Sequence, residues 1–186
     1  MALLKVTCRE YATREDLERL FSYLIRNEKN PVVLSNLPIA RIRGVHVQEL
    51  AAQWCYAHKV YQPDLSRTLC YHYVLAFDLF SDIEYEALKH HYSRIASELS
   101  CLNILSGLYY FQSYHQNRGG IPMHLHIIVD SLYHNIGTST FIRFDELKEE
   151  LGETLAAYGI ALAGYSYERG GKIYKGNYSP RELYTF

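Results

Sequence analysis

Residues 121–130 read IPMHLHIIVD, an apolar run that carries two histidines one residue apart. The run is rich in residues that favour strands, and it follows QNRGG at 116–120, a sequence typical of a turn. Side chains along a strand alternate between the two faces of a sheet. His124, His126 and Asp130 are therefore predicted to share one face. The apolar side chains of the other face are Met123, Leu125, Ile127 and Val129.

The segment before the turn, LSGLYYFQSYH at 105–115, is also predicted to be a strand, and it ends in a third histidine. We expect the two strands to pair as a hairpin, with residue 115 opposite 122 and residue 113 opposite 124. His115 would then lie diagonally across from His124 on the same face, about 7–8 Å away. Three neutral imidazoles on rigid strands can bind one metal ion and leave coordination positions open. A slip of one residue would move His115 to the other face.

The rest of the chain alternates between strand and helix patterns. Strands are predicted at 3–7 and 68–80, and helices at 13–30, 45–61, 81–99 and 143–158. Thr13 and Asp16 resemble a capping box at the start of the first helix, and Gly159 ends the last helix. This order predicts an α+β fold, with a mostly antiparallel central sheet and helices packed on it. The length fits a single domain over 1–186, with 165–186 as a tail in which RGG could turn a last hairpin.

The composition argues against several classes of protein. The net charge is −1 and the pI is about 6.7, so any binding to nucleic acid needs a local basic patch. The four cysteines form no CxxC pair, which argues against a zinc ribbon and suits reduced thiols in the cytoplasm. No segment approaches the ~18 apolar residues of a membrane span. We therefore expect a cytoplasmic monomer that does not enter a membrane.

Three segments of the sequence resemble the HUH relaxases, the nicking enzymes that start plasmid mobilisation. HQNRGGIPMHLHIIVDS at 115–131 is similar to the family's signature of a histidine, a turn and a histidine-x-histidine pair. YHYVLAFD at 71–78 is similar to the strand that precedes this signature. FSYLIRNEKN at 21–30 is similar to the first-helix segment that carries the catalytic tyrosine in several mobilisation branches. The resemblance implies an HUH endonuclease-like fold, in order of elements, over roughly residues 3–160.

This resemblance implies site-specific and strand-specific nicking of single-stranded DNA at a transfer origin. His115, His124 and His126 would hold a divalent metal, Mg²⁺ or Mn²⁺ by family expectation, although three histidines also suit Zn²⁺. Tyr23 would attack the scissile phosphate and form a 5′-phosphotyrosine intermediate. Because an ordinary tyrosine has a pKa near ~10, the metal, a base or a cation must activate it. A small accessory mobilisation protein is the partner expected by analogy.

The helical pattern agrees with Tyr23 as the nucleophile. Tyr23 lies about 130° from the centre of the apolar stripe of the first helix, so we predict that it lies off the core. The alternative nucleophiles within this interpretation are Tyr11, Tyr71 and Tyr73.

Other residues are candidates for supporting roles. Hydrogen bonds that orient the metal ligands are expected from His72, Asp78 and Asp130. Single-stranded DNA is held by stacking and by local positive charge. The basic residues expected to contact DNA are Arg41, Arg43, Arg169, Lys172 and Lys175.

Two other functions fit the same residues. A rolling-circle replication initiator performs the same chemistry with a tyrosine that usually follows the histidine strand, and Tyr133 lies seven residues after His126. A catalytically inactive DNA-binding or metal-binding protein is the other alternative. It is favoured by Asn117, which stands where many family members carry Asp, and by the near-neutral pI. Cleavage of an oligonucleotide, or its absence, separates these classes.

Overall fold

The fold is seen in a computed structural model of the chain. The residues that it describes are 2–7, 10–25, 33–35, 46–61, 68–77, 94–95, 97–98, 101–102, 110–115, 123–133, 138–139, 144–169 and 172–177.

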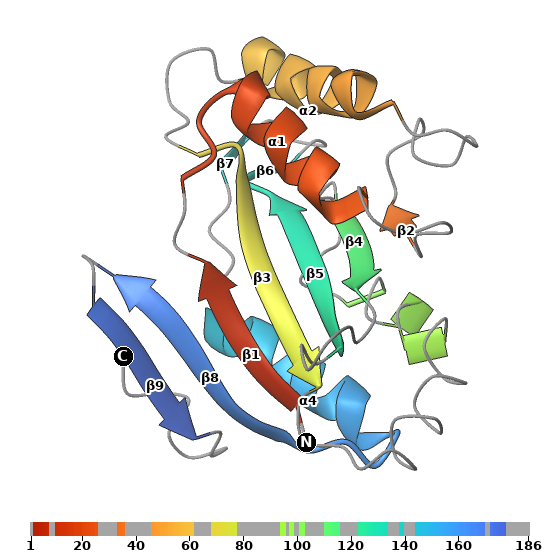
Figure 1. Ribbon diagram of the computed structural model, residues 1–186, viewed down its shortest axis with the longest axis vertical. Helices are drawn as coiled ribbons and strands as arrows, with labels where there is room; N and C mark the ends of the chain where they lie inside the picture. The colour runs from red at the N-terminus through yellow and green to blue at the C-terminus, as the bar shows by residue number, and fades with distance from the viewer. Residues whose placement is uncertain are drawn as a thin grey trace.

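Within these residues, seven strands form the main sheet, in the order β2-β4-β5-β3-β1-β8-β9 (Figure 1). In chain order the strands are β1 (Ala2–Thr7), β2 (Val33–Ser35), β3 (Cys70–Phe77), β4 (Tyr110–His115), β5 (Met123–Asp130), β8 (Leu162–Arg169) and β9 (Lys172–Asn177). A separate pair is made by β6 (Leu132–Tyr133) and β7 (Thr138–Ser139). The helices are α1 (Arg14–Ile25), α2 (Val47–Tyr61) and α4 (Phe144–Ala156).

The main sheet is mostly antiparallel. Its antiparallel pairs are β2–β4, β4–β5, β5–β3, β3–β1 and β8–β9. The pairing of β1 with β8 is parallel. The expected α+β class, with a mostly antiparallel sheet and flanking helices, is therefore confirmed.

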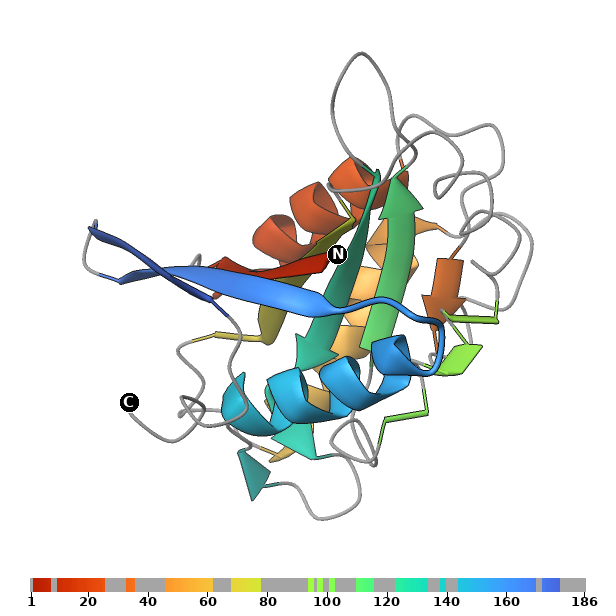
Figure 2. The same ribbon diagram turned by 90° about the horizontal axis from the view of Figure 1, so that it is seen from below.

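The helices lie on both faces of the sheet (Figure 2). On one face, α1 and α2 pack together over β3 and β5. Their cluster of buried residues is Tyr11, Leu17, Leu20, Phe21, Leu24, Leu50, Ala51, Trp54, Leu69, Cys70 and Ile128. The rings of Phe21 and Trp54 are 5.7 Å apart, and Trp54 Nε1 donates a hydrogen bond to the carbonyl oxygen of Leu69. This bond ties α2 to the start of β3.

The opposite face carries α4, which buries a stripe of three leucines spaced four residues apart. These are Leu147, Leu151 and Leu155. The helix ends as predicted at Gly159, whose φ of 71° is in the left-handed region that glycine adopts without strain. The amide of Gly159 bonds the carbonyl of Ala156, and that of Ile160 bonds the carbonyl of Leu155. This pair of bonds is a Schellman motif.

The start of α1 is the predicted capping box. The Thr13 hydroxyl accepts a hydrogen bond from the Asp16 amide, and the Asp16 carboxylate accepts one from the Thr13 amide. Each donor is one that the first turn of a helix would otherwise leave without a partner. These bonds fix where α1 begins.

The segment 165–186 differs from the predicted tail. Residues 165–169 and 172–177 belong to β8 and β9, which pair as the hairpin that the RGG sequence suggested, with Arg169 opposite Lys172. The parallel pairing of β8 with β1 was not predicted, because nothing local in either segment marks a partner so distant in the chain. Residues 178–186 lie outside the described part of the chain.

Other predicted elements are shorter in the structure or fall partly outside its described residues. The strands predicted at 68–80 and 105–115 are described as Cys70–Phe77 and Tyr110–His115. Of the helix predicted at 81–99, only 94–95 and 97–98 are described, and these residues are helical. The first helix is described as far as Ile25.

Candidate functional site

The register of β4 and β5 brings the three histidines to one face of the sheet. His115 pairs directly with His124, and Ser113 pairs with His126. The predicted register was therefore wrong by two residues, because β5 begins at Met123, just after a proline that cannot donate to a strand ladder. A shift of two residues preserves the face on which each side chain lies.

We call the face that carries His124, His126 and Asp130 the histidine face. On β3 the same face carries Cys70, His72, Val74 and Ala76, which are paired with the even-numbered residues of β5. Cys70 and Ile128 of this face belong to the core cluster under α1 and α2. The histidine face is thus the face that the two helices cover.

His124 and His126 approach each other edge to face. Their ring centroids are 4.9 Å apart at an interplanar angle of 77°. His126 is buried, while His124 is half-buried. The partner of His124 on β3 is Ala76, whose side chain is a single methyl group. The two imidazoles therefore stand side by side at the border between the core and the surface.

A chain of hydrogen bonds leads from the core to His126. The hydroxyl of Tyr11 lies 2.8 Å from Nδ1 of His72, and Nε2 of His72 lies 2.8 Å from Nδ1 of His126. All three residues are buried. His72 therefore contacts a predicted metal ligand, as the sequence suggested, and Tyr11 is an additional member that the sequence analysis considered only as a nucleophile.

Tyr23 lies in the last described turn of α1, against the same histidine. Its ring centroid is 5.5 Å from that of His126, with an interplanar angle of 85°. The side chain is 40% exposed, so it is off the core as the helical pattern predicted. Figure 1 shows α1 crossing the sheet in front of β3 and β5 towards β4, which places this turn over the histidine strands.

The other tyrosines named in the sequence analysis are less suitably placed. Tyr71 and Tyr73 pair with Val129 and Ile127, so they lie on the face opposite the histidines. Burial raises the pKa of both phenols, which makes the phenolate harder to form. Tyr133 is in β6, beyond the Asp130 end of β5. Tyr11 is buried and bonded to His72.

Asp130 has a different partner from the one predicted. Its Oδ1 lies 2.6 Å from Nε2 of His58 and accepts a hydrogen bond from the amide of Leu132. It lies four residues from His126, which is about 13 Å along a strand. These two bonds tie Asp130 to α2 and to the chain after β5, and its role toward a metal ligand stays a prediction. His58 was missed because only tertiary packing brings α2 over the end of β5.

The register of the β8–β9 hairpin places basic residues expected to bind DNA on two different faces of the sheet. Lys175 is in register with Ser166, and through Ser166 with Lys5 of β1, which places it on the histidine face. Arg169 and Lys172 pair with each other at alternate positions, on the other face. The remaining predicted residues, Arg41, Arg43 and Asp78, lie outside the described part of the chain.

Lys5 is a cation that the sequence analysis overlooked. It pairs with Val74, which in turn pairs with His126, so the three residues form one row across the sheet. Lys5 is exposed. Two strand spacings separate it from His126, which is about 10 Å between backbones. The alternation of LLKVT could have revealed its face, but only the strand order shows its distance from the histidines.

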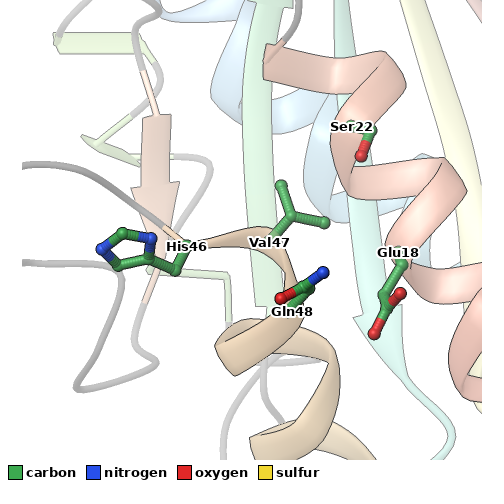
Figure 3. A pocket seen from close by; sticks show the side chains of 5 residues that line it. All are labelled: Glu18, Ser22, His46, Val47 and Gln48. Carbon is green, nitrogen blue, oxygen red and sulfur yellow. The ribbon is translucent and has the colours of Figure 1, made fainter.

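A hollow of about 330 Å³ lies beside this site, between α1 and the start of α2 (Figure 3). Its lining residues are Glu18, Ser22, His46, Val47 and Gln48. Glu18 is held by an ion pair with Arg14 at 2.8 Å. The hollow contains none of the histidines of β5, so it is a neighbour of the candidate site and not part of it.

The donor set suits a divalent transition metal. His124 and His126 are adjacent on one face, and the backbone places His115 directly opposite His124. Because Nδ1 of His126 contacts His72, a bond from His126 to a metal would use Nε2. Where the structure describes side chains, it gathers no three His, Cys, Asp or Glu residues as a metal site, and His115 is placed by its backbone alone.

Comparisons of the chain with protein families, with curated proteins and with solved structures find no match. In the described part of the chain, no helix is both long enough and apolar enough to cross a membrane.

Proposed function

We propose that this protein is a metal-dependent nuclease that nicks single-stranded DNA by tyrosine transesterification, in the manner of the HUH relaxases. The main support is the position of Tyr23. Its partly exposed ring contacts His126 on the face that also carries His124 and, by register, His115. A nucleophile on the first helix beside histidines of the central hairpin is consistent with the mobilisation form of this reaction.

Each residue has a distinct task in the proposed reaction. His115, His124 and His126 would hold Mg²⁺ or Mn²⁺, with Zn²⁺ as the alternative, and the bound metal supplies Lewis-acid polarisation of the phosphate oxygens. The phenolic oxygen of Tyr23 forms a bond to phosphorus as the bond from phosphorus to the 3′-oxygen breaks. The phenol loses its proton and the 3′-oxygen gains one. The products are a 5′-phosphotyrosine and a free 3′-hydroxyl, and the reverse reaction can rejoin the ends.

Lys5 supplies positive charge near the proposed reaction. It is exposed on the histidine face, in the row of His126. We propose that it contacts a backbone phosphate of the bound strand, together with Lys175 in the same row. Such contacts hold single-stranded DNA without dependence on sequence.

The proposed biological role is mobilisation of a plasmid or another mobile element. The protein would act in the cytoplasm as a monomer at a transfer origin, with a small accessory protein as its partner. A rolling-circle initiator would use Tyr133, which lies beyond the opposite end of β5 from His124. The contact of Tyr23 with His126 therefore favours mobilisation.

Covalent trapping tests this proposal. The protein is incubated with pooled single-stranded oligonucleotides and Mn²⁺, with or without EDTA, and protein–DNA adducts are separated on denaturing gels. We expect an adduct that EDTA abolishes and that Tyr23→Phe reduces at least ~10³-fold, since the nucleophile is removed. Tyr56→Phe is the matched control, because Tyr56 is also a helical tyrosine and is 69% exposed.

Three results would contradict parts of the proposal. An adduct that still forms in Tyr23→Phe would support the reaction but show that another residue is the nucleophile. An adduct that forms equally well with EDTA would show that the reaction needs no metal. Binding of DNA without any adduct, using DNA from the protein's own genetic neighbourhood, would favour the inactive DNA-binding alternative.

A further inference from the structure

We propose that Tyr11 and His72 are positioning residues that give His126 the hydrogen-bond partners it needs in the one tautomer able to bind a metal through Nε2. This inference rests on the proposed metal site and adds a device that selects the state of one ligand. Its basis is the buried chain of two hydrogen bonds, each 2.8 Å long, that ends at Nδ1 of His126.

The chain admits two arrangements of its protons when both histidines are neutral. In the first, Tyr11 donates to Nδ1 of His72, and Nε2 of His72 donates to Nδ1 of His126. His126 then carries its proton on Nε2 and cannot bind a metal there. In the second, Nδ1 of His126 donates to Nε2 of His72, and Nδ1 of His72 donates to the oxygen of Tyr11. Only this second arrangement leaves Nε2 of His126 with a lone pair.

The hydroxyl of Tyr11 makes the second arrangement available. A phenolic oxygen can accept as well as donate a hydrogen bond. The two nitrogens of His72 can therefore exchange their roles as donor and acceptor. Both arrangements hold the same number of protons, so the change releases no proton to solvent. Metal ligands are commonly held through their second nitrogen in this way, which fixes the ring and its tautomer.

The backbone around these two hydrogen bonds is itself held by hydrogen bonds. The two 2.8 Å distances can therefore be maintained without the metal. The amide of Tyr11 donates to the Thr68 hydroxyl, and the carbonyl of Tyr11 accepts from the amide of Leu69 at 2.7 Å. The carbonyl of His72 accepts from the Thr7 hydroxyl at 2.9 Å. Tyr11 and His72 are thus anchored to β3 and β1, on rigid elements beside the ligand.

Removal of the Tyr11 hydroxyl should weaken metal binding without removing a ligand. In Tyr11→Phe, the second arrangement leaves a buried N–H of His72 without an acceptor, so the equilibrium moves to the first arrangement. We expect the affinity for Mn²⁺, measured by titration calorimetry, to fall about 10–100-fold. Tyr73→Phe is the matched control, since it also removes a buried phenol hydroxyl, but from the face of β3 opposite the histidines.

Two variants of His72 separate positioning from packing. His72→Gln retains an amide oxygen that can accept from Nδ1 of His126, so we expect Mn²⁺ affinity within a few-fold of the wild type. His72→Leu has no acceptor, and it should lose about 10–100-fold. Thermal unfolding followed by circular dichroism identifies any variant that loses affinity because it fails to fold.

Nitrogen-15 spectra of the imidazoles test the tautomer directly, with Zn²⁺ as a diamagnetic probe. We expect the Zn²⁺-bound wild type to carry protons on Nδ1 of both His126 and His72. A proton on Nε2 of His126 in that state would overturn the inference, as would wild-type Mn²⁺ affinity in Tyr11→Phe. Neither result would affect Tyr23 or DNA cleavage. Failure of the folded wild type to bind Mn²⁺ at all would instead contradict the proposed metal site and this inference together.

Discussion

β5 contributes to two buried hydrogen bonds that involve histidine, through Asp130 at its end and through His126 near its middle, and the two bonds differ in what surrounds them. In the first, His58 and Asp130 form a pair in which both side chains are almost wholly enclosed. In the second, His126 is bonded to His72 but also contacts the partly exposed ring of Tyr23. The bonded histidines are equally buried, so the difference lies in their neighbours, because the exposed Tyr23 and the half-buried His124 adjoin His126.

This comparison suggests that Asp130 and His126 have different roles on the same strand. The Asp130 end lies under α2 and the core cluster, where a histidine bonded to a carboxylate stabilises the fold. His126 lies beside the last described turn of α1, next to the exposed Tyr23, and this is where we propose that the substrate binds. Changes at Asp130 and Lys5 would break or sharpen this contrast.

The largest expected effect on stability comes from the Asp130 end. Asp130→Ala leaves buried His58 without its partner and the amide of Leu132 without its acceptor. We expect a loss of about 3 kcal/mol in the free energy of unfolding, measured with urea. Replacing both members, as His58→Leu with Asp130→Leu, should recover much of this loss. If Asp130→Ala is stable but cleaves DNA more slowly, the functional site would instead lie at the Asp130 end of β5.

Lys5 should produce a smaller effect, confined to DNA binding. Lys5→Ala removes one proposed phosphate contact, so we expect affinity for single-stranded DNA to fall about fivefold at 0.1 M salt. The slope of log K against log salt should decrease by about 0.7. Lys172→Ala is the control, because its backbone position is on the opposite face. Equal losses in the two variants would contradict a path for DNA along the histidine face.

The smallest effect concerns the capping box at the start of α1. The hydrogen bond from the Thr13 side chain is the main reason that the pKa of Asp16 lies below its ordinary value of 3.8. A lowered pKa in the folded state contributes stability above the unfolded pKa, and this contribution is lost as pH falls through the folded value. Asp16→Asn should therefore reduce the acid dependence of stability below about pH 4. An unchanged acid dependence would show that the bond to Thr13 does not persist in solution.

Features with a local cause were predictable from the sequence. The capping box at Thr13, the end of α4 at Gly159 and the shared face of His124 and His126 each follow from neighbouring residues. The exposed position of Tyr23 followed from helical periodicity, because the stripe it lies outside is local to α1.

Features with a distant cause were not predictable. The Tyr11–His72 bond joins residues 61 positions apart, and the His58–Asp130 bond joins residues 72 positions apart. The register of β4 with β5 was misjudged by two residues, since hairpin geometry depends on where pairing resumes after the loop. Likewise, only the parallel pairing of β8 with β1 shows that Lys175 and Lys5 share a row.

The most direct test of the central claim is to locate the DNA in the trapped wild-type adduct by peptide mass spectrometry. Trypsin cuts after arginine and lysine, so three of the candidate tyrosines fall in separate peptides: Tyr11 in 10–14, Tyr23 in 20–26 and Tyr133 in 119–143. We expect the nucleotide remnant on the peptide 20–26, attached to Tyr23. A remnant on 119–143 would contradict the mobilisation-type site and support the rolling-circle alternative.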